Sequence, residues 1–196
     1  MKKILTTLIL FVTLYQSYGQ TVTYDDFKSL IPFLQAEDWK SAFNQSAKIL
    51  KGTENDSSDY KAIVLYINIY TAAGMVSVGD MTYDDLAKNV MKYKGQKIIM
   101  SAHPVSDSET KTINKTHLTV NDSTNEAFTS ASNGKGTSIF CFEKIKVKDK
   151  IDLSEFPANS FARCGGTLEK IETNPNKSTI WILRLTVVDA FIRKPN

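Results

Sequence analysis

Apolar and polar positions follow two different periods along the chain, and the change of period divides it in two. Between residues 24 and 91, apolar residues recur every three or four positions, as on one face of an amphipathic helix. Between residues 97 and 192, short runs rich in Ile, Val, Thr and Phe are separated by Asn, Asp, Ser, Gly and Pro, which is typical of strands joined by turns. The pattern therefore predicts a helical half followed by a strand half.

Helices are expected at four places in the first half. The first begins after Thr23 and is short or kinked, because Pro32 interrupts helical hydrogen bonding. The next covers residues 39–50. The third, at 63–78, is apolar on most sides, which predicts that it is the buried helix. The last begins after Thr82 and runs to about residue 93.

The tripeptide Tyr-Asp-Asp occurs twice, at residues 24–26 and 83–85, each time after a threonine. Paired carboxylates could form a metal or acid–base site. At a helix start, however, an acid three residues after threonine completes a capping box and lies at the positive end of the helix dipole. We therefore expect both segments to cap helices.

The second half is expected to hold three strands, a connector with one helical turn at 152–156, and a hairpin that turns at 174–177. The expected strands are 97–105, 116–120, 137–147, 160–171 and 179–192.

This strand order resembles the OB-fold, on the residues of 93–99, 139–142, 164–171 and 183–190. The chain is most similar, over about residues 92–194, to the tRNA-anticodon-binding-like OB modules of small exported bacterial proteins. The resemblance implies a five-stranded, partly open barrel of a kind that binds oligonucleotides, oligosaccharides or peptides, and it transfers no functional residue. The expected fold class is therefore α+β, with a small helical bundle at 20–94 and an OB-like β-barrel at 95–196.

Residues 1–19 contain the three parts of a secretory signal peptide: two lysines, an apolar run at 4–15, and the small residues Ser17 and Gly19 before the cleavage point. Twelve helical residues rise about 18 Å, short of a ~30 Å hydrocarbon core, which disfavours the alternative of a membrane anchor. We expect an exported protein, periplasmic or secreted. Cleavage lowers the formal net charge from +3 to +1, so the mature protein has no overall field that attracts polyanions.

Cys141 and Cys164 are the two cysteines of the chain. Export permits a disulfide between them, which for a loop of this length contributes about 3 kcal/mol. Two buried thiols are equally consistent, because the spacing does not show whether the Cα atoms approach each other.

No catalytic or metal-binding motif is present. The chain has two histidines, His103 and His117, and it lacks G-x-S-x-G, C-x-x-C, H-x-x-x-H and H-E-x-x-H. The glycine-containing stretch 133–136 precedes a strand, so it is expected to be a turn and not a phosphate loop. We expect no metal, no cofactor and no enzymatic activity. An unrecognised active site would need a concave pocket with converging carboxylates or a histidine of shifted pKa.

The best candidate for a binding surface is the strand at 137–147 and its extension to residue 150. A period of two places aromatic rings and lysines on one face, which in OB-folds holds single-stranded nucleic acid. Cys141, Ile145 and Val147 fall on the other face, with Glu143 and Asp149 as exceptions. The alternative is that the phenylalanines are core residues after a bulge and that the lysines guard an exposed edge. The candidate ligand-binding residues are Phe140, Phe142, Lys144, Lys146 and Lys148.

The function expected from these patterns is a binding or interaction module for a protein or peptide partner. The alternative is binding of nucleic acid or another anionic polymer through the face at 140–150. No run of eighteen apolar residues occurs, so no membrane span is expected after signal cleavage.

Overall fold

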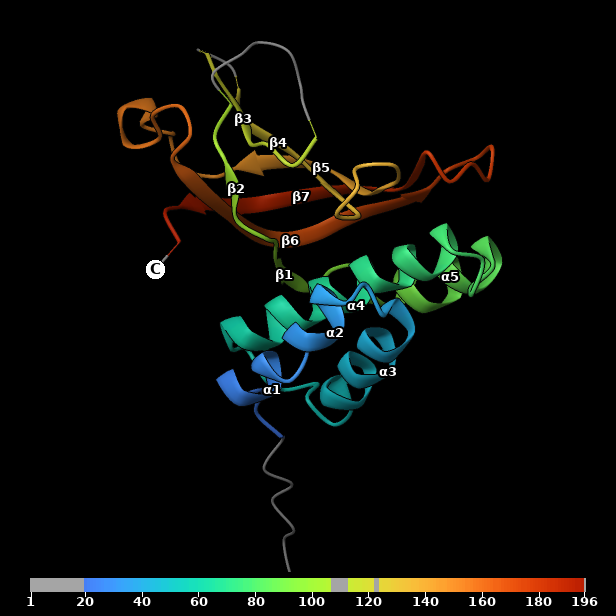
Figure 1. Ribbon diagram of the computed structural model, residues 1–196. Helices are drawn as coiled ribbons and strands as arrows, with labels where there is room; N and C mark the ends of the chain where they lie inside the picture. The colour runs from blue at the N-terminus through green and yellow to red at the C-terminus, as the bar shows by residue number, and fades with distance from the viewer. Residues whose placement is uncertain (1–19, 107–112, 122–123, 196) are drawn as a thin grey trace, which may run out of the picture.

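The computed structural model describes residues 20–106, 113–121 and 124–195. The expected signal peptide lies outside these ranges. Helices come first and strands follow, and Figure 1 shows the helices together on one side of the sheet. The helices are α1 (Tyr24–Lys28), α2 (Ile31–Gln35), α3 (Trp39–Leu50), α4 (Asp59–Ser77) and α5 (Tyr83–Val90), with the 3-10 turns η1 (Met91–Tyr93) and η2 (Leu153–Glu155). The strands are β1 (Lys97–Ile99), β2 (His103–Pro104), β3 (His117–Val120), β4 (Asn125–Ser132), β5 (Ile139–Val147), β6 (Phe161–Thr173) and β7 (Trp181–Arg193).

Both Tyr-Asp-Asp segments begin helices, as predicted. The Thr23 hydroxyl accepts the backbone N–H of Asp26, and the Asp26 carboxylate accepts that of Thr23, which completes a capping box. The Thr82 hydroxyl accepts the N–H of Asp85 at 3.1 Å in the same way. Both threonines therefore satisfy a backbone donor at the start of their helix. Asp26 satisfies a second donor in α1, whereas the Asp85 carboxylate accepts the Thr82 hydroxyl in α5.

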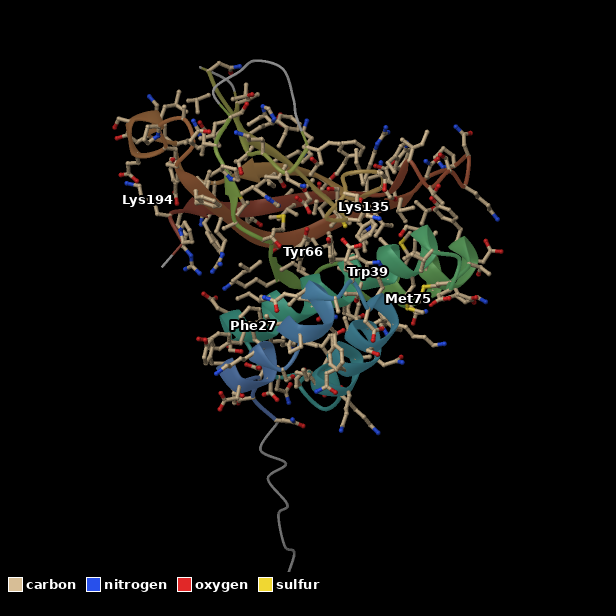
Figure 2. All side chains as sticks on the ribbon, viewed as in Figure 1. Phe27, Trp39, Tyr66, Met75, Lys135 and Lys194 are labelled. Carbon is tan, nitrogen blue, oxygen red and sulfur yellow. The ribbon has the colours of Figure 1, made fainter. Side chains whose placement is uncertain are left out.

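The long helix α4 is the central helix of its layer and is buried along most of its length, as its apolar pattern predicts. Trp39 of α3 packs edge-on against Tyr70 of α4, with ring centroids 5.6 Å apart. Gly74 permits this contact, because a Cβ there would lie 2.7 Å from the Trp39 ring. Figure 2 shows Trp39 and Tyr66 where the helices meet the sheet.

The strands form one sheet in the order β1-β6-β7-β5-β4-β3, with β2 paired to β6. β5 and β7 run parallel and the other pairs antiparallel. The expected α+β class, the hairpin between β6 and β7 and the helical turn η2 in the connector are all confirmed. The expected barrel is not confirmed, because the sheet is open: among the described residues, its two ends approach at a single bridge between Val105 and Thr116.

The sequence did not predict one of the strands, and one expected strand is two separate strands in the structure. β4 is rich in alanine and serine, which have low strand propensity, so its sequence resembles a polar loop. The expected strand at 97–105 is divided into β1 and β2, both paired with β6.

Two adjacent glycines allow β6 to pass close to its neighbours. A Cβ on Gly166 would lie 2.6 Å from the carbonyl oxygen of Val188, and one on Gly165 would lie 2.9 Å from that of Ile98. Because real Cβ atoms do not approach backbone so closely, these positions require glycine for the packing of β1 and β7 on β6.

One of the apolar clusters extends from the helices into the sheet. It contains Tyr66 and Ile69 of α4 together with Phe140, Leu168 and Leu185 of the strands. The helical layer and the sheet therefore stabilise each other by shared burial. None of the described helices combines the length and the apolar character needed to cross a membrane.

Candidate ligand-binding face of the sheet

The central strands β4, β5 and β7 have two faces of different character. Thr129 and Glu143 lie opposite each other on β4 and β5, and both belong to the face toward α4, where Tyr66 contacts Glu143. Because successive side chains of a strand point to opposite faces, the neighbouring pair Phe128 and Lys144 points away from the helices. We call this second face the outer face of the sheet.

The outer face contains a hollow of about 480 Å³. Its aromatic members, Phe128 and Phe142, are half-buried, whereas Lys144, Glu172 and Arg184 are exposed. A concave surface that combines apolar area with a few charged groups is the usual form of a ligand site. The residues that line the hollow include Phe128, Ile139, Phe142, Lys144, Glu172 and Arg184.

Cations lie beside aromatic rings on this face. The Lys144 ammonium is 5.7 Å from the centroid of the Phe128 ring, and the Arg184 guanidinium is 4.3 Å from that of Trp181. The Trp181 ring is in turn 6.4 Å from Phe142. These contacts hold the cationic groups close to apolar surface, where they can contact the same ligand.

The lysines of the outer face also have acidic partners. Three ion pairs join neighbouring residues, with N–O distances of 3.1, 3.8 and 2.9 Å. Each pair is at least partly exposed, so each stabilises the fold by less than about 1 kcal/mol. The ion pairs affect the binding of a polyanion more strongly, because an approaching polyanion must compete with the carboxylates for the lysines. The pairs are Lys144–Glu126, Lys146–Glu169 and Lys170–Glu172.

The structure brings together only part of the predicted site. Phe142, Lys144 and Lys146 lie on the outer face, and Lys148 is exposed just beyond the end of β5. Phe140 does not join them, which corrects the sequence-based placement. It is fully buried, with its ring centroid 5.0 Å from that of Trp39.

The displacement of Phe140 has a specific cause. The register of β4 and β5 shifts between Ala131 and Ser132, so β5 has one extra residue at this point. Such a bulge interrupts the period of two and redirects a side chain, here toward the helices. The alternative of a core phenylalanine beside a bulge is therefore the one that holds for Phe140.

Sequence reasoning missed the residues that other strands contribute to the hollow. Phe128 belongs to the unpredicted β4, and Glu172 lies near the end of β6. Arg184 could have been predicted from the sequence. It is a cation between two leucines of a regular strand, and because side chains alternate between faces, it points away from the buried face of the leucines. Trp181, at the start of the same strand, is half-buried beside Phe142.

Glu143 also lines the hollow, yet it is only 2 % exposed and its carboxyl is turned toward α4. Tyr66 donates a hydrogen bond of 2.5 Å to its Oε1, and the Thr129 hydroxyl donates to its Oε2. Burial raises the pKa of Glu143 to about 7, although both hydrogen bonds favour the ionised form and oppose this rise. The alternation of residues in the sequence already placed Glu143 on the apolar face of β5, which is the buried face in the structure.

Cys141 and Cys164 are both free and both buried, so the alternative of a disulfide is wrong. β7 lies between their strands, and two strand spacings amount to about 10 Å, whereas a disulfide needs Cα atoms within about 7 Å. Burial raises the pKa of Cys164 to about 12 and that of Cys141 well above its usual value. Both thiols are therefore protonated at neutral pH.

In the described part of the chain, no three His, Cys, Asp or Glu side chains form a group that could hold a metal ion. Comparisons with protein-family models, curated proteins and solved structures find no match.

Proposed function

We propose that the protein is an exported, non-enzymatic binding module that holds an extended peptide segment of a partner protein on the outer face of its sheet. The observation that supports this most directly is the hollow of about 480 Å³ between Phe128 and Phe142, flanked by Lys144 and Arg184. An apolar side chain of the partner would enter the hollow, and the adjacent charged groups would fix its orientation.

The charges of the outer face favour a peptide over an anionic polymer. Polyanion binding depends on cations that are free to replace counterions. Here Lys144 and Lys146 already lie beside Glu126 and Glu169, and the hollow itself carries an acid, Glu172, close to Arg184 in the paired strands. A partner with apolar side chains and both signs of charge complements this surface better than a chain of phosphates does.

We also infer that the strand half is a partly open barrel of the OB type. The bridge between Val105 and Thr116, at the two ends of the sheet, supports this, since OB-folds are five-stranded and only partly closed. OB-folds use one sheet face for extended ligands, which agrees with the proposed role of the outer face.

Export is supported by the signal-peptide pattern at 1–19, and it has a direct test. Mass spectrometry of the protein from cell fractions and culture fluid should find a chain that begins at Gln20 outside the cytoplasm. An uncleaved chain confined to the cytoplasm would contradict export.

The binding proposal is tested with a random peptide library displayed on phage and selected on the mature protein. Peptides that bind should lose about tenfold or more in affinity, roughly 1.4 kcal/mol, toward Phe142→Ala and Arg184→Ala. Lys135→Ala is the matched control, because this exposed lysine lies in the turn between β4 and β5. A selection in which no peptide depends on Phe142 or Arg184 would count against the proposal.

The nucleic-acid alternative is measured on the same protein by fluorescence anisotropy of a labelled oligothymidine. Binding that weakens steeply with salt, and that falls further in Lys144→Ala and Lys146→Ala, would replace the peptide proposal with that alternative.

A further inference from the structure

The carboxyl of Glu143 connects three elements at the boundary between the helices and the sheet. It belongs to β5, it accepts a hydrogen bond from Tyr66 of α4, and it accepts another from Thr129 of β4. Figure 2 shows Tyr66 where the helices meet the sheet. This buried carboxyl is therefore part of the contact that holds α4 against the sheet.

Among the described residues, the side chains that hydrogen-bond to the Glu143 carboxyl, Tyr66 and Thr129, carry no positive charge, and the cations Lys144 and Arg184 line the hollow on the outer face. Tyr66 and Tyr70 face it from α4, Cys141 from its own strand, and Cys164 from β6. Burial raises the pKa of each of these four groups, so all of them are neutral near pH 7. From β4 and β7 it faces Thr129 and Leu185. Glu143 is thus the group in this cluster that changes its charge near neutral pH.

The same residue is directly linked to the hollow on the other face. Phe142 and Lys144, its two chain neighbours, both line the hollow. Any movement of β5 that accompanies a change at Glu143 would therefore displace two groups of the proposed peptide site.

We propose that protonation of Glu143 regulates the outer face: the neutral carboxyl keeps α4 packed on the sheet and the hollow in its binding form, and ionisation loosens both. This inference rests on the function proposed above. The physical reason is that an ionised carboxylate inside a protein must gain water or further donors, and here the strand or helix must shift to admit them.

The test uses the two tryptophans of the chain, one on each side of the sheet. The Trp181→Phe variant leaves Trp39, which reports the contact between helices and sheet. The Trp39→Phe variant leaves Trp181, which lies beside Phe142 and reports the hollow. We expect the fluorescence of both variants, without any ligand, to change with one shared midpoint close to pH 7. Adding Glu143→Gln, which mimics the neutral carboxyl, should abolish that change.

Two further variants complete the experiment. Glu126→Gln removes a partly exposed carboxylate from the same sheet and should leave the midpoint unchanged. Tyr66→Phe removes a hydrogen bond that favours the ionised form, so it should move the midpoint to higher pH; this variant remains informative even if Glu143→Gln does not fold. Both histidines are present in every variant, so the part of the titration that Glu143→Gln removes belongs to Glu143.

An unaltered titration in Glu143→Gln, or an unmoved midpoint in Tyr66→Phe, would overturn the inference. Because these measurements need no ligand, they separate failure of the pH response from failure of peptide binding. If a selected peptide is available, its affinity should fall as the pH rises through 7 in the original protein and stay constant in Glu143→Gln.

Discussion

The hydroxyl of Tyr66 donates a hydrogen bond of 2.5 Å to the carboxyl of Glu143, which is 77 positions further along the chain. The contact joins the central helix to the central strand inside the shared core. A carboxyl in this position gives the whole fold a pH dependence, since the folded and unfolded chains bind its proton with different affinity.

The first prediction is that the protein loses stability as the pH rises toward 8. The folded pKa of Glu143, about 7, lies above its ordinary value of 4.5, so between these values the folded chain binds more protons than the unfolded one. The stability that Glu143 contributes is fully present below its ordinary pKa of 4.5. It is lost as the pH rises through its folded pKa of about 7. The free energy of unfolding should fall by up to about 3 kcal/mol from this group, measured with urea at about pH 5 and about pH 8. Glu143→Gln should flatten this dependence, and Glu126→Gln should not.

The second prediction concerns two phenylalanines of one strand. Phe140→Ala should lower the free energy of unfolding by about 3–5 kcal/mol, because the ring is fully buried against Trp39 and Tyr70. Phe142→Ala should cost about 1–2 kcal/mol, since its half-buried ring loses less burial, while peptide binding is lost. Urea denaturation of the two variants side by side checks this difference. Equal losses would mean that the bulge does not redirect Phe140.

Local signals in the sequence predicted most of the elements. The caps at Thr23 and Thr82 and the turn at 174–177 are short-range features that a few neighbouring residues determine. β4 could not be predicted this way, because Ala127 and Ala131 become strand residues through pairing with β5, a tertiary contact.

The candidate site was predictable only in part for the same reason. Phe142 and Lys144 follow the period of two within one strand, and the sequence places them correctly on one face. Phe128 and Arg184 join them through pairings across the sheet, and pairing cannot be read from one strand alone. Phe140 was misplaced because a bulge depends on the register with the neighbouring strand.

The third prediction is that the native protein contains two protected thiols. Cys141 and Cys164 are buried and their pKa values are raised, so the reactive thiolate is scarce at neutral pH. Reaction with an aromatic disulfide reagent should be slow in the native state and should reach two thiols per chain in denaturant. A native mass about 2 Da lower than the sequence requires would indicate a disulfide and contradict this prediction.

The last prediction tests the contact between α3 and α4. A glycine-to-alanine substitution inside a helix normally stabilises the helix, because alanine has a higher helix propensity than glycine by about 1 kcal/mol. Here the added Cβ would lie 2.7 Å from the rigid Trp39 ring, so the substitution should instead destabilise the protein by about 1–3 kcal/mol. Trp39→Leu removes the obstructing ring, and in the double variant the effect of Gly74→Ala should become neutral or stabilising. Thermal unfolding of the four proteins in this double-mutant cycle gives the coupling between the two positions. A Gly74→Ala loss that stays the same with Trp39 absent would show that the steric contact is not its cause.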